Sequence, residues 1–316
     1  MENQRILVTG GAGFIGSNLA NHLAERNEVV VVDDESLGTS GHLDAAVEFH
    51  SGSVLDPDLP TDVDVVYHLA ACSSYAMHEE NPARGARVNV EGFVNTVEQA
   101  RQAGCDTIVY ASTSSIYGSQ TEPTPESIPV AASSGYEASK LARERYAEYF
   151  HRHYGMSLAG MRFFSVYQGY DGAESHKGTY ANVIAQFAEE IADGRSPVLF
   201  GDGTQTRDFV HVDDIVRGLE LAGEHELTGV YNLGTGEPYS FNRVVSMINE
   251  QLSVTVEPEY VDNPIPANVY VHDTCADYSR FHAVTGWEPS VSLEEGIERI
   301  CAAYPTVQTR LRAATS

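Results

Sequence analysis

A tyrosine and a lysine stand four residues apart in the stretch SSGYEASKLARERY (133–146). Ser133 and Ser134 are good helix N-cap residues and Gly155 is a suitable helix end, so the residues between them are predicted to form one helix. Tyr136 and Lys140 then lie one turn apart on the same helix face. A free tyrosine, with a pKa of about 10, is a weak base at neutral pH. A neighbouring ammonium group favours the phenolate, which can take a proton from a hydroxyl group.

Lysine is otherwise rare in this chain. Of 19 basic residues, Lys140 and Lys177 are the two lysines, and the rest are arginines. Arginine could supply a positive charge, but its planar fork differs in shape from the compact ammonium of lysine. We therefore expect Lys140 to be kept for its geometry, beneath a ribose and beside the phenol. Because tyrosine and lysine often occur at this spacing on exposed helices, an incidental pair is the alternative.

A glycine-rich turn, GGAGFIG, follows the first apolar stretch and opens a helix-like segment. The spacing of Gly10, Gly13 and Gly16 suits a tight turn, a close approach of the backbone to a pyrophosphate, and a helix packed against a strand. Asp33 ends the next predicted strand, where a carboxylate accepts hydrogen bonds from a ribose and repels a 2′-phosphate. This context predicts a dinucleotide site that prefers NAD to NADP. A structural turn beside a surface aspartate is the alternative.

Short β-branched stretches alternate with helix-like segments along the N-terminal half of the chain. The predicted strands cover 5–10, 28–33, 47–52, 64–70, 107–112 and 157–164, and the helix-like segments include 14–26 and 90–103. Such alternation, with nearly all-apolar strands, predicts an α/β fold with a doubly wound parallel sheet covered on both faces.

Two domains are expected from this pattern. Residues 1–166 would form a Rossmann domain, to which 208–236 return as a strand, a helix and a strand. Residues 167–207 and 237–316 would form a smaller C-terminal substrate-binding lobe. The site is expected in the cleft between them, at the carboxyl edge of the sheet.

The chain is strongly acidic, with 45 acidic and 19 basic residues among 316 and a formal net charge of -26. Because no run of basic residues is present, nucleic acid and anionic membrane surfaces are not expected as partners. A hydrophobic content of 42% argues against disorder. Acidity with scarce lysine is typical of a halophilic protein in a salt-filled cytoplasm, where about 1 M salt screens the repulsion. An ordinary acidic protein is the alternative.

Four cysteines, Cys72, Cys105, Cys275 and Cys301, are far apart and form no CxxC motif. Neither a metal site nor a disulfide is therefore expected, and the thiols are expected to be reduced. The sequence contains no apolar signal segment and no apolar run long enough to span a bilayer. We expect a soluble, cytoplasmic protein without a metal.

A series of motifs along nearly the whole chain resembles the extended short-chain dehydrogenase/reductase family, and more closely its nucleotide-sugar epimerase/dehydratase branch. The motifs are VTGGAGFIG (8–16), VVVDD (30–34), HLAA (68–71), NVEGFVN (89–95), ASTSSIYG (111–118), YEASK (136–140), MRFFSVY (161–167), GDGTQTRDFVHVDDIV (201–216), YNLGTG (231–236) and GWEPSVSLEEGI (286–297). The resemblance implies an NAD-dependent epimerase, most similar to the UDP-glucose/UDP-galactose 4-epimerases, with a transient 4-keto sugar. It also implies a homodimer formed through the helices at 90–103 and 136–154.

The resemblance further implies roles for individual residues. Thr113 would hydrogen-bond the sugar hydroxyl beside Tyr136, and these two residues with Lys140 form the implied catalytic set. Arg207 would pair with the substrate diphosphate. The implied cofactor-binding residues are Gly10, Gly13, Phe14, Ile15, Gly16, Asp33, Asp34, Val54, Leu69, Ala70, Ala71, Tyr136, Lys140 and Phe164, and the implied substrate-binding residues are Thr113, Ser165, Lys177 and Arg207.

The chain departs from the family pattern in the substrate region. Ser165 stands where the family has an asparagine that touches substrate, and the stretch 263–277 lacks the arginine of an RPGD-like motif. One of the two usual diphosphate arginines is thus missing or supplied from elsewhere. The stretch ESHKG (174–178) is similar to the HKG of ADP-heptose 6-epimerases, so Lys177 either reaches a phosphate or lies on a surface loop.

Two serines, Ser114 and Ser115, follow the implied active-site threonine. The family's 4,6-dehydratases carry an Asp-Glu pair there, and its UDP-glucuronate decarboxylases carry a Glu. Because no extra acid is available, epimerisation is favoured over water elimination. The alternatives are an epimerase of UDP-N-acetylhexosamine, UDP-glucuronate or ADP-heptose type, a net NAD-dependent sugar dehydrogenase, and a catalytically silent NAD-binding regulator. An intact Thr/Tyr/Lys set speaks against the last.

Overall fold

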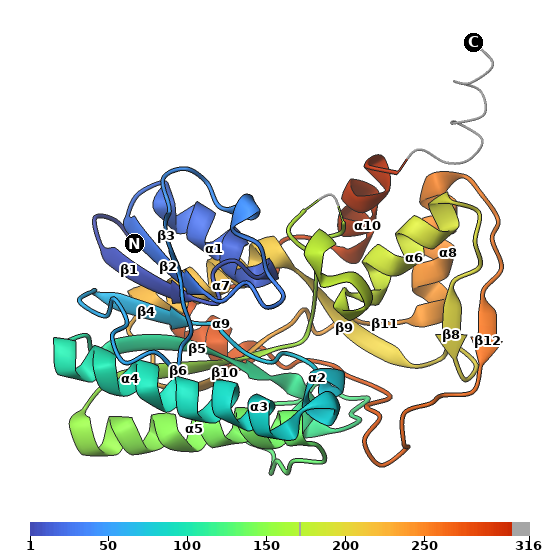
Figure 1. Cartoon of the computed structure of the whole chain (residues 1–316). Helices are drawn as coiled ribbons and strands as arrows, with labels where there is room; N and C mark the ends of the chain where they lie inside the picture. The colour runs from blue at the N-terminus through green and yellow to red at the C-terminus, as the bar shows by residue number, and fades with distance from the viewer. Residues whose placement is uncertain (171, 305–316) are drawn as a thin grey trace.

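A parallel sheet of seven strands organises the molecule, in a computed structural model that describes residues 1–170 and 172–304. The strand order is β10-β6-β5-β4-β1-β2-β3 (Figure 1). The strands are β1 (Arg5–Thr9), β2 (Glu28–Asp33), β3 (Glu48–Ser51), β4 (Val65–His68), β5 (Thr107–Thr113), β6 (Ser157–Phe163) and β10 (Gly229–Leu233). All neighbouring pairs run parallel. The predicted α/β fold with a doubly wound parallel sheet is therefore confirmed.

The order of the strands reverses between β1 and β4. From β1 the chain adds β2 and β3 on one side, and from β4 it adds β5, β6 and finally β10 on the other. A reversal of this kind opens a crevice at the carboxyl ends of the two central strands. The glycine turn after β1 and the HLAA stretch after β4 both lie at this crevice.

Helices cover both faces of the sheet (Figure 1). The helices α4 (Gly92–Ala103) and α5 (Gly135–Tyr154) cover one face, and α1 (Phe14–Ala24) and α7 (Val212–Glu224) cover the other. Helix α5 begins after Ser134, whose side chain accepts a hydrogen bond from the Glu137 amide at 3.3 Å, and ends at Gly155 with φ 76°. The predicted start and end of this helix are both confirmed.

Short elements fill the connections. They are the helices α2 (Tyr75–Glu80), α3 (Pro82–Ala86) and α9 (Ser279–Thr285), the π-helical turn η2 (Arg87–Glu91), and the 3-10 turns η1 (Ser40–His42), η3 (Ser114–Tyr117) and η4 (Ser175–Tyr180). Because η2 leads directly into α4, the segment predicted as one helix over 90–103 begins with a π-helical turn. Such turns often occur at functional sites.

A second lobe lies beyond the carboxyl edge of the sheet (Figure 1). Its helices are α6 (Val183–Ala192), α8 (Phe241–Leu252) and α10 (Leu293–Ala302), and its strands are β7 (Ser165–Tyr167), β8 (Val198–Phe200), β9 (Thr206–His211), β11 (Pro238–Ser240) and β12 (Glu259–Val261). The strands form a three-stranded sheet in the order β11-β9-β7 and a two-stranded sheet of β12 and β8.

Residues 208–236 were expected to return to the Rossmann domain as a strand, a helix and a strand, and the first of these strands lies elsewhere in the structure. Helix α7 packs beside α1, and β10 extends the large sheet next to β6. Strand β9, however, pairs with β7 and β11 and does not join the large sheet. The reason is that β7 follows β6 after the single residue Phe164, leaves the large sheet, and offers β9 a parallel partner. The division of the chain into two domains stays a prediction.

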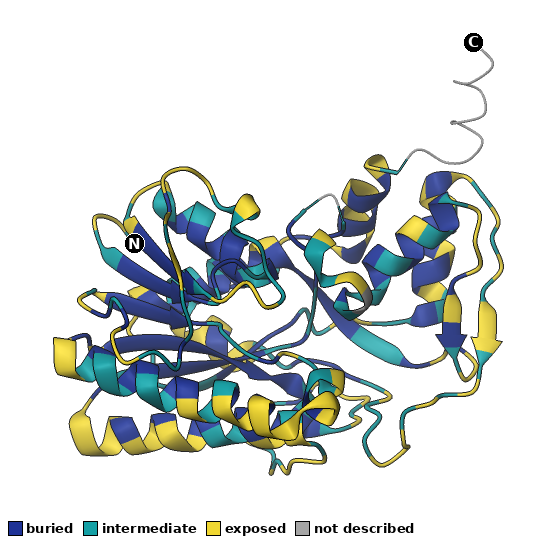
Figure 2. Cartoon of the chain, viewed as in Figure 1, coloured by how far each residue is buried: buried dark blue, intermediate teal, exposed yellow. Residues whose placement is uncertain are grey.

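Buried apolar side chains form three clusters, which Figure 2 shows as dark blue along the strands and the inner helix faces. One lies between the sheet and helices α1 and α7, one between the sheet and helices α4 and α5, and one among α6, α8 and α10. Among the described residues, no helix combines the length and the apolar character that crossing a membrane requires.

Candidate active site

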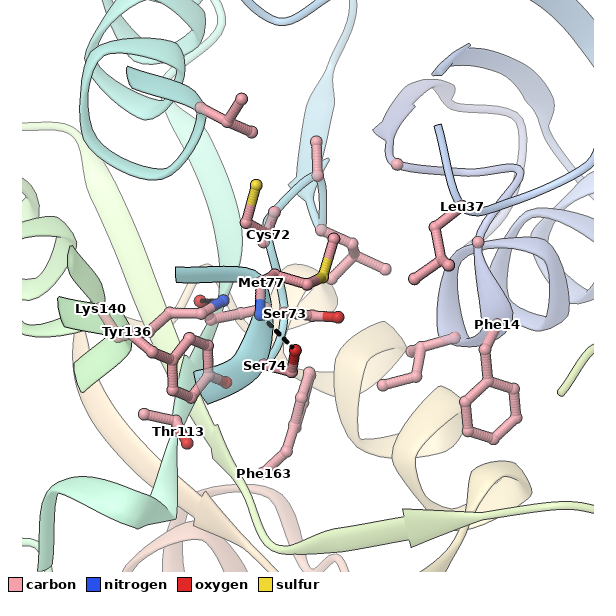
Figure 3. A pocket seen from close by; sticks show the side chains of 18 of the residues that line it. Phe14, Leu37, Cys72, Ser73, Ser74, Met77, Thr113, Tyr136, Lys140 and Phe163 are labelled. Carbon is pink, nitrogen blue, oxygen red and sulfur yellow. Dashed lines mark hydrogen bonds between the residues drawn. The ribbon is translucent and has the colours of Figure 1, made fainter. Parts of the chain in front are cut away.

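A cavity of about 540 Å³ lies where the crevice of the large sheet meets the second lobe. Every residue that the sequence predicted for the catalytic, cofactor and substrate sites lines this cavity, although the segments come from distant parts of the chain. Figure 3 shows Phe14 and Leu37 on one side and Tyr136, Lys140 and Thr113 on the other. The cavity therefore joins the glycine turn and the tyrosine–lysine pair into one candidate site.

The glycine turn forms a cradle, a hollow in the backbone that exists because these positions carry no side chains. Gly10 has φ +71°, and a Cβ placed on it would lie 2.5 Å from the Ala70 amide nitrogen. A Cβ on Gly16 would lie 2.1 Å from the Gly10 carbonyl oxygen. Gly13 precedes α1, and no side chain caps this helix start. Free main-chain N–H groups at the N-terminus of an eleven-residue helix suit a pyrophosphate.

Asp33 holds its carboxylate at the end of β2 by two main-chain hydrogen bonds. Oδ2 accepts from the Ala12 amide at 3.1 Å, and Oδ1 accepts from the Glu35 amide at 2.7 Å. Burial raises the pKa of Asp33, and these two N–H groups oppose the increase. Asp34 and Val54 line the same end of the cavity. The position suits a ribose, as the sequence predicted.

Replacing Asp33 by asparagine is expected to weaken discrimination against NADP. The substitution keeps one acceptor oxygen but removes the charge that repels a 2′-phosphate, so the ratio of the NADP and NAD dissociation constants should fall by about tenfold. Calorimetric titration of cofactor-stripped protein with each dinucleotide measures this ratio. Asp44→Asn, at an exposed position outside the cavity, is the control. An unchanged ratio in Asp33→Asn would remove Asp33 from the ribose site.

Tyr136 lies at the cavity wall, partly buried, with Thr113 and Lys140 beside it (Figure 3). Burial raises the pKa of the Tyr136 phenol, while the hydrogen bond with Thr113 and the charge of Arg143 oppose the increase. The Lys140 ammonium nitrogen lies 5.8 Å from the Tyr136 ring centre and donates to the Ala111 carbonyl at 3.2 Å. That Lys140 favours the phenolate stays a prediction, and the charge of Arg143 lowers the same pKa.

Thr113 ends β5 and faces the cavity without an acid beside it. Its hydroxyl lies 3.0 Å from that of Ser115 and accepts a hydrogen bond from the Ser115 amide. Glu137 also lines the cavity, but its carboxylate accepts from the Ser133 amide at 2.6 Å and so caps α5. The two serines that the sequence identified thus leave no free carboxylate next to Thr113 in the described structure.

The substrate end of the cavity contains Arg207 on β9. Its Nη1 donates to the carbonyls of Thr206 and His272, both at 2.8 Å. The guanidinium carbon lies 5.6 Å from the ring centres of Phe241 and of Tyr270. Burial lowers the pKa of Arg207. The hydrogen bonds and the rings fix the guanidinium in place, as an anion-binding group requires.

Lys177 lines the cavity from η4, and its Nζ lies 5.2 Å from the Phe14 ring centre at the start of α1. Burial lowers its pKa, and the charge of Glu174 opposes the decrease. Of the two expectations for Lys177, a contact with phosphate therefore fits this position and an exposed surface loop does not.

Several lining residues were not identified from the sequence. Tyr270 and Thr274 come from the stretch that departs from the family pattern, and its composition carries no signal of their position. Ser74 and Met77 belong to the start of α2, where the Met77 amide donates to the Ser74 hydroxyl at 3.2 Å (Figure 3). The Ser-x-x-Met pattern could have predicted this cap, but not its place in the cavity.

The turn η2 fixes the wall behind the catalytic pair through Asn89, which is fully buried. Its side-chain oxygen accepts from the Cys72 amide at 2.8 Å, and its amide nitrogen donates to the Ser139 hydroxyl at 2.8 Å. These contacts tie the loop after β4 to α5. The contacts of Asn89 are those of a structural residue.

The comparisons with known proteins agree with this geometry. The model of the NAD dependent epimerase/dehydratase family matches residues 6–234. The chain is 36% identical to a UDP-glucose 4-epimerase of Mycolicibacterium smegmatis over 93% of this chain and 96% of that protein. It is 32% identical to UDP-glucuronic acid decarboxylase 6 of Arabidopsis thaliana over 93% of this chain and 87% of that protein.

A solved structure is similar throughout. The UDP-glucose 4-epimerase of Thermotoga maritima, solved with UDP-glucose, superposes with a TM-score of 0.85 at 34% identity and covers 98% of this chain and 99% of that one. The chain therefore belongs to the NAD dependent epimerase/dehydratase family. NAD is the cofactor of this family, and the glycine cradle, the open start of α1 and the Asp33 carboxylate fit it.

Proposed function

We propose that the chain is a UDP-hexose 4-epimerase that interconverts UDP-galactose and UDP-glucose. The observation that carries the proposal is that Thr113, Tyr136 and Lys140 line one cavity with the dinucleotide cradle and that, among the described residues, no free acid lies beside Thr113. The identity to UDP-glucose 4-epimerases supports the same substrate. The similarity to a UDP-glucuronic acid decarboxylase does not favour decarboxylation, because the acid expected beside the threonine for that reaction is replaced by serine here.

The proposed mechanism begins at the sugar 4-hydroxyl. Thr113 and Tyr136 hold this hydroxyl, and the Tyr136 phenolate takes its proton. NAD supplies the hydride acceptor and later the hydride donor when bound. Lys140, whose Nζ lies 5.8 Å from the Tyr136 ring centre, would hold the nicotinamide ribose. The 4-keto sugar turns about its link to the diphosphate and presents its other face, and Tyr136 returns the proton to the new hydroxyl. The cycle causes no net oxidation or reduction.

Arg207 is proposed to hold the diphosphate about which the sugar turns. Arg207→Met is expected to raise the KM for UDP-galactose by about 10- to 100-fold, the loss of one charge-assisted hydrogen-bonding group, and to change kcat by only a few-fold. Steady-state kinetics measures both constants. Arg243→Met on α8, at a side chain paired with Glu250 at 3.0 Å, is the control. A lower kcat with an unchanged KM would contradict a binding role.

The functional test is conversion of UDP-galactose by the purified protein in multimolar KCl, followed through the anomeric proton signals by NMR. UDP-glucose formed without added cofactor supports a 4-epimerase that retains NAD. Steady release of NADH would indicate a net dehydrogenase. If UDP-galactose is inert, a panel of UDP-N-acetylhexosamine, UDP-glucuronate and ADP-heptose identifies the substrate, and loss of carbon dioxide from UDP-glucuronate would indicate a decarboxylase.

We further propose a homodimer in a salt-filled cytoplasm. Helix α5 exposes Tyr146, Tyr149 and Tyr154, each between 41% and 46% accessible, on the face that it shares with α4. Exposed aromatic side chains are typical of protein interfaces. The net charge of -26 supports a working environment in which salt screens repulsion between two copies.

A further inference from the structure

Arg143 is a buried cation on the helix that carries Tyr136 and Lys140. It lies on α5, one turn after Lys140 and two turns after Tyr136, and is fully buried. Its guanidinium donates to three main-chain carbonyls, those of Asn89 (Nε, 2.6 Å), Ala70 (Nη2, 2.8 Å) and Ala111 (Nη1, 3.4 Å). Within the described residues, no carboxylate forms an ion pair with it.

A buried charge without a counter-ion is costly, so the fold must compensate for it in another way. The guanidinium carries five N–H groups. Its Nε, Nη1 and Nη2 atoms each donate one hydrogen bond to a carbonyl oxygen. Burial lowers the pKa of Arg143 to about 10, with the phenols of Tyr136 and Tyr110 opposing the decrease. Arg143 therefore remains charged at neutral pH.

The three carbonyls belong to the walls of the active site. Ala70, two residues after β4, and Ala111, in β5, line the cavity, and Asn89 lies in the π-helical turn. The Ala111 carbonyl also accepts from the Lys140 ammonium at 3.2 Å. Arg143 and Lys140 thus share one acceptor, and Arg143 links three segments that must keep their relative positions around the cofactor.

We propose that Arg143 is a positioning residue of the active site, which fixes the carbonyl that holds Lys140 and adds a permanent positive charge to that of Lys140 behind Tyr136. The proposal rests on the proposed epimerase function. The charge of Arg143 lowers the pKa of Tyr136, against the effect of burial. Lys140 donates to the Ala111 carbonyl that Arg143 also holds, and the charge of Arg143 adds to the electrostatic stabilisation of the phenolate.

A further permanent cation, Arg84 on α3, lines the cavity, but its side chain is exposed, so solvent and salt screen its charge. The neighbours on the packed elements are Glu137 on α5, His78 on α2, Cys72 after β4, His68 on β4 and Tyr110 on β5. Burial lowers the pKa of both histidines, so they are neutral near pH 7. Burial raises the pKa of the Cys72 thiol. Arg143 is thus a buried cation near Tyr136 whose charge a substitution can remove while Thr113, Tyr136 and Lys140 stay in place.

The test compares Arg143→Gln, which keeps hydrogen-bond donors without charge, with Arg143→Lys, which keeps charge without the fork. Arg145→Met is the control, since that side chain is 71% exposed and lies 3.6 Å from Glu148. Activity requires the phenolate, so kcat/KM rises with pH through an acidic limb. In Arg143→Gln this limb should move upward by roughly one pH unit. In Arg143→Lys and in the control it should stay within a few tenths of a unit.

A second readout does not depend on turnover. The tyrosinate absorbance that disappears on Tyr136→Phe is titrated in the wild-type and Arg143→Gln backgrounds, with NAD content and thermal midpoint measured alongside. The same upward shift of roughly one pH unit is expected. If the wild-type protein turned over none of the nucleotide sugars, the proposed function would fail, while this titration would still decide the role of Arg143.

A purely structural role would lower the thermal midpoint and the NAD content of both variants equally and leave the acidic limb and the Tyr136 titration in place. That result would overturn the proposal. The proposal would also be overturned if the acidic limb of kcat/KM lay at the same pH in Arg143→Gln and Arg143→Lys, because the two variants differ in charge. If Arg143→Gln is recovered unfolded, Arg143→Met in the presence of saturating NAD takes its place as the uncharged variant.

Discussion

Tyr136→Phe is expected to lower epimerase turnover by about 10³- to 10⁴-fold while the protein keeps its NAD. The substitution removes the phenolic oxygen that is hydrogen-bonded with Thr113 and leaves the aromatic ring, whose centre lies 5.8 Å from that of the His78 ring. The cradle of glycines and the Asp33 carboxylate are untouched. Turnover is measured by NMR with UDP-galactose, and retained NAD by its absorbance after the protein is unfolded.

Tyr260→Phe is the matched control for this substitution. Tyr260 is 52% exposed on β12, in the second lobe, and its phenol lies 3.0 Å from the Asn242 side-chain oxygen outside the cavity. The turnover of Tyr260→Phe should equal that of the wild type. Full activity in Tyr136→Phe would contradict the proposed proton transfer, and loss of NAD together with activity would point to a cofactor-binding role for Tyr136.

Arg162→Met is expected to lower the free energy of unfolding by about 3–5 kcal/mol. Arg162 on β6 forms a bidentate pair with Glu144 on α5 at 2.9 Å and 2.8 Å, and both side chains are at most 5% exposed. Glu144 also accepts from the Ser112 hydroxyl at 2.6 Å, next to Thr113. Removing the cation leaves a buried carboxylate without its partner. Urea unfolding at fixed KCl and saturating NAD measures the loss.

The double variant Glu144→Met with Arg162→Met distinguishes the two parts of this effect. Because both buried charges are removed, it should recover at least half of the stability lost in Arg162→Met. Arg152→Met provides the exposed comparison: Arg152 and Glu148 are 69% and 43% accessible, so its loss should stay below about 1 kcal/mol. If Arg162→Met also lowered the free energy of unfolding by less than about 1 kcal/mol, the buried pair would not stabilise the fold.

Local patterns were sufficient to predict the large sheet, the glycine turn and the helix of the catalytic pair. Apolar β-branched stretches specify buried parallel strands, a glycine with positive φ specifies the turn, and the serine cap and Gly155 bound α5. Each signal depends on residues close in sequence, so it can be read without the tertiary contacts. The placement of Asp33 after β2 is of the same kind.

The partners of these elements depended on contacts between distant segments, which local sequence does not encode. Strand β9 joins β7 because the chain leaves the large sheet at Phe164, and the loop with Tyr270 reaches the cavity only when the second lobe packs. The role of Arg143 has the same origin. An arginine within a helix normally predicts a solvated side chain, and only the folding of β4, β5 and η2 around it supplies the three carbonyls that make its burial possible.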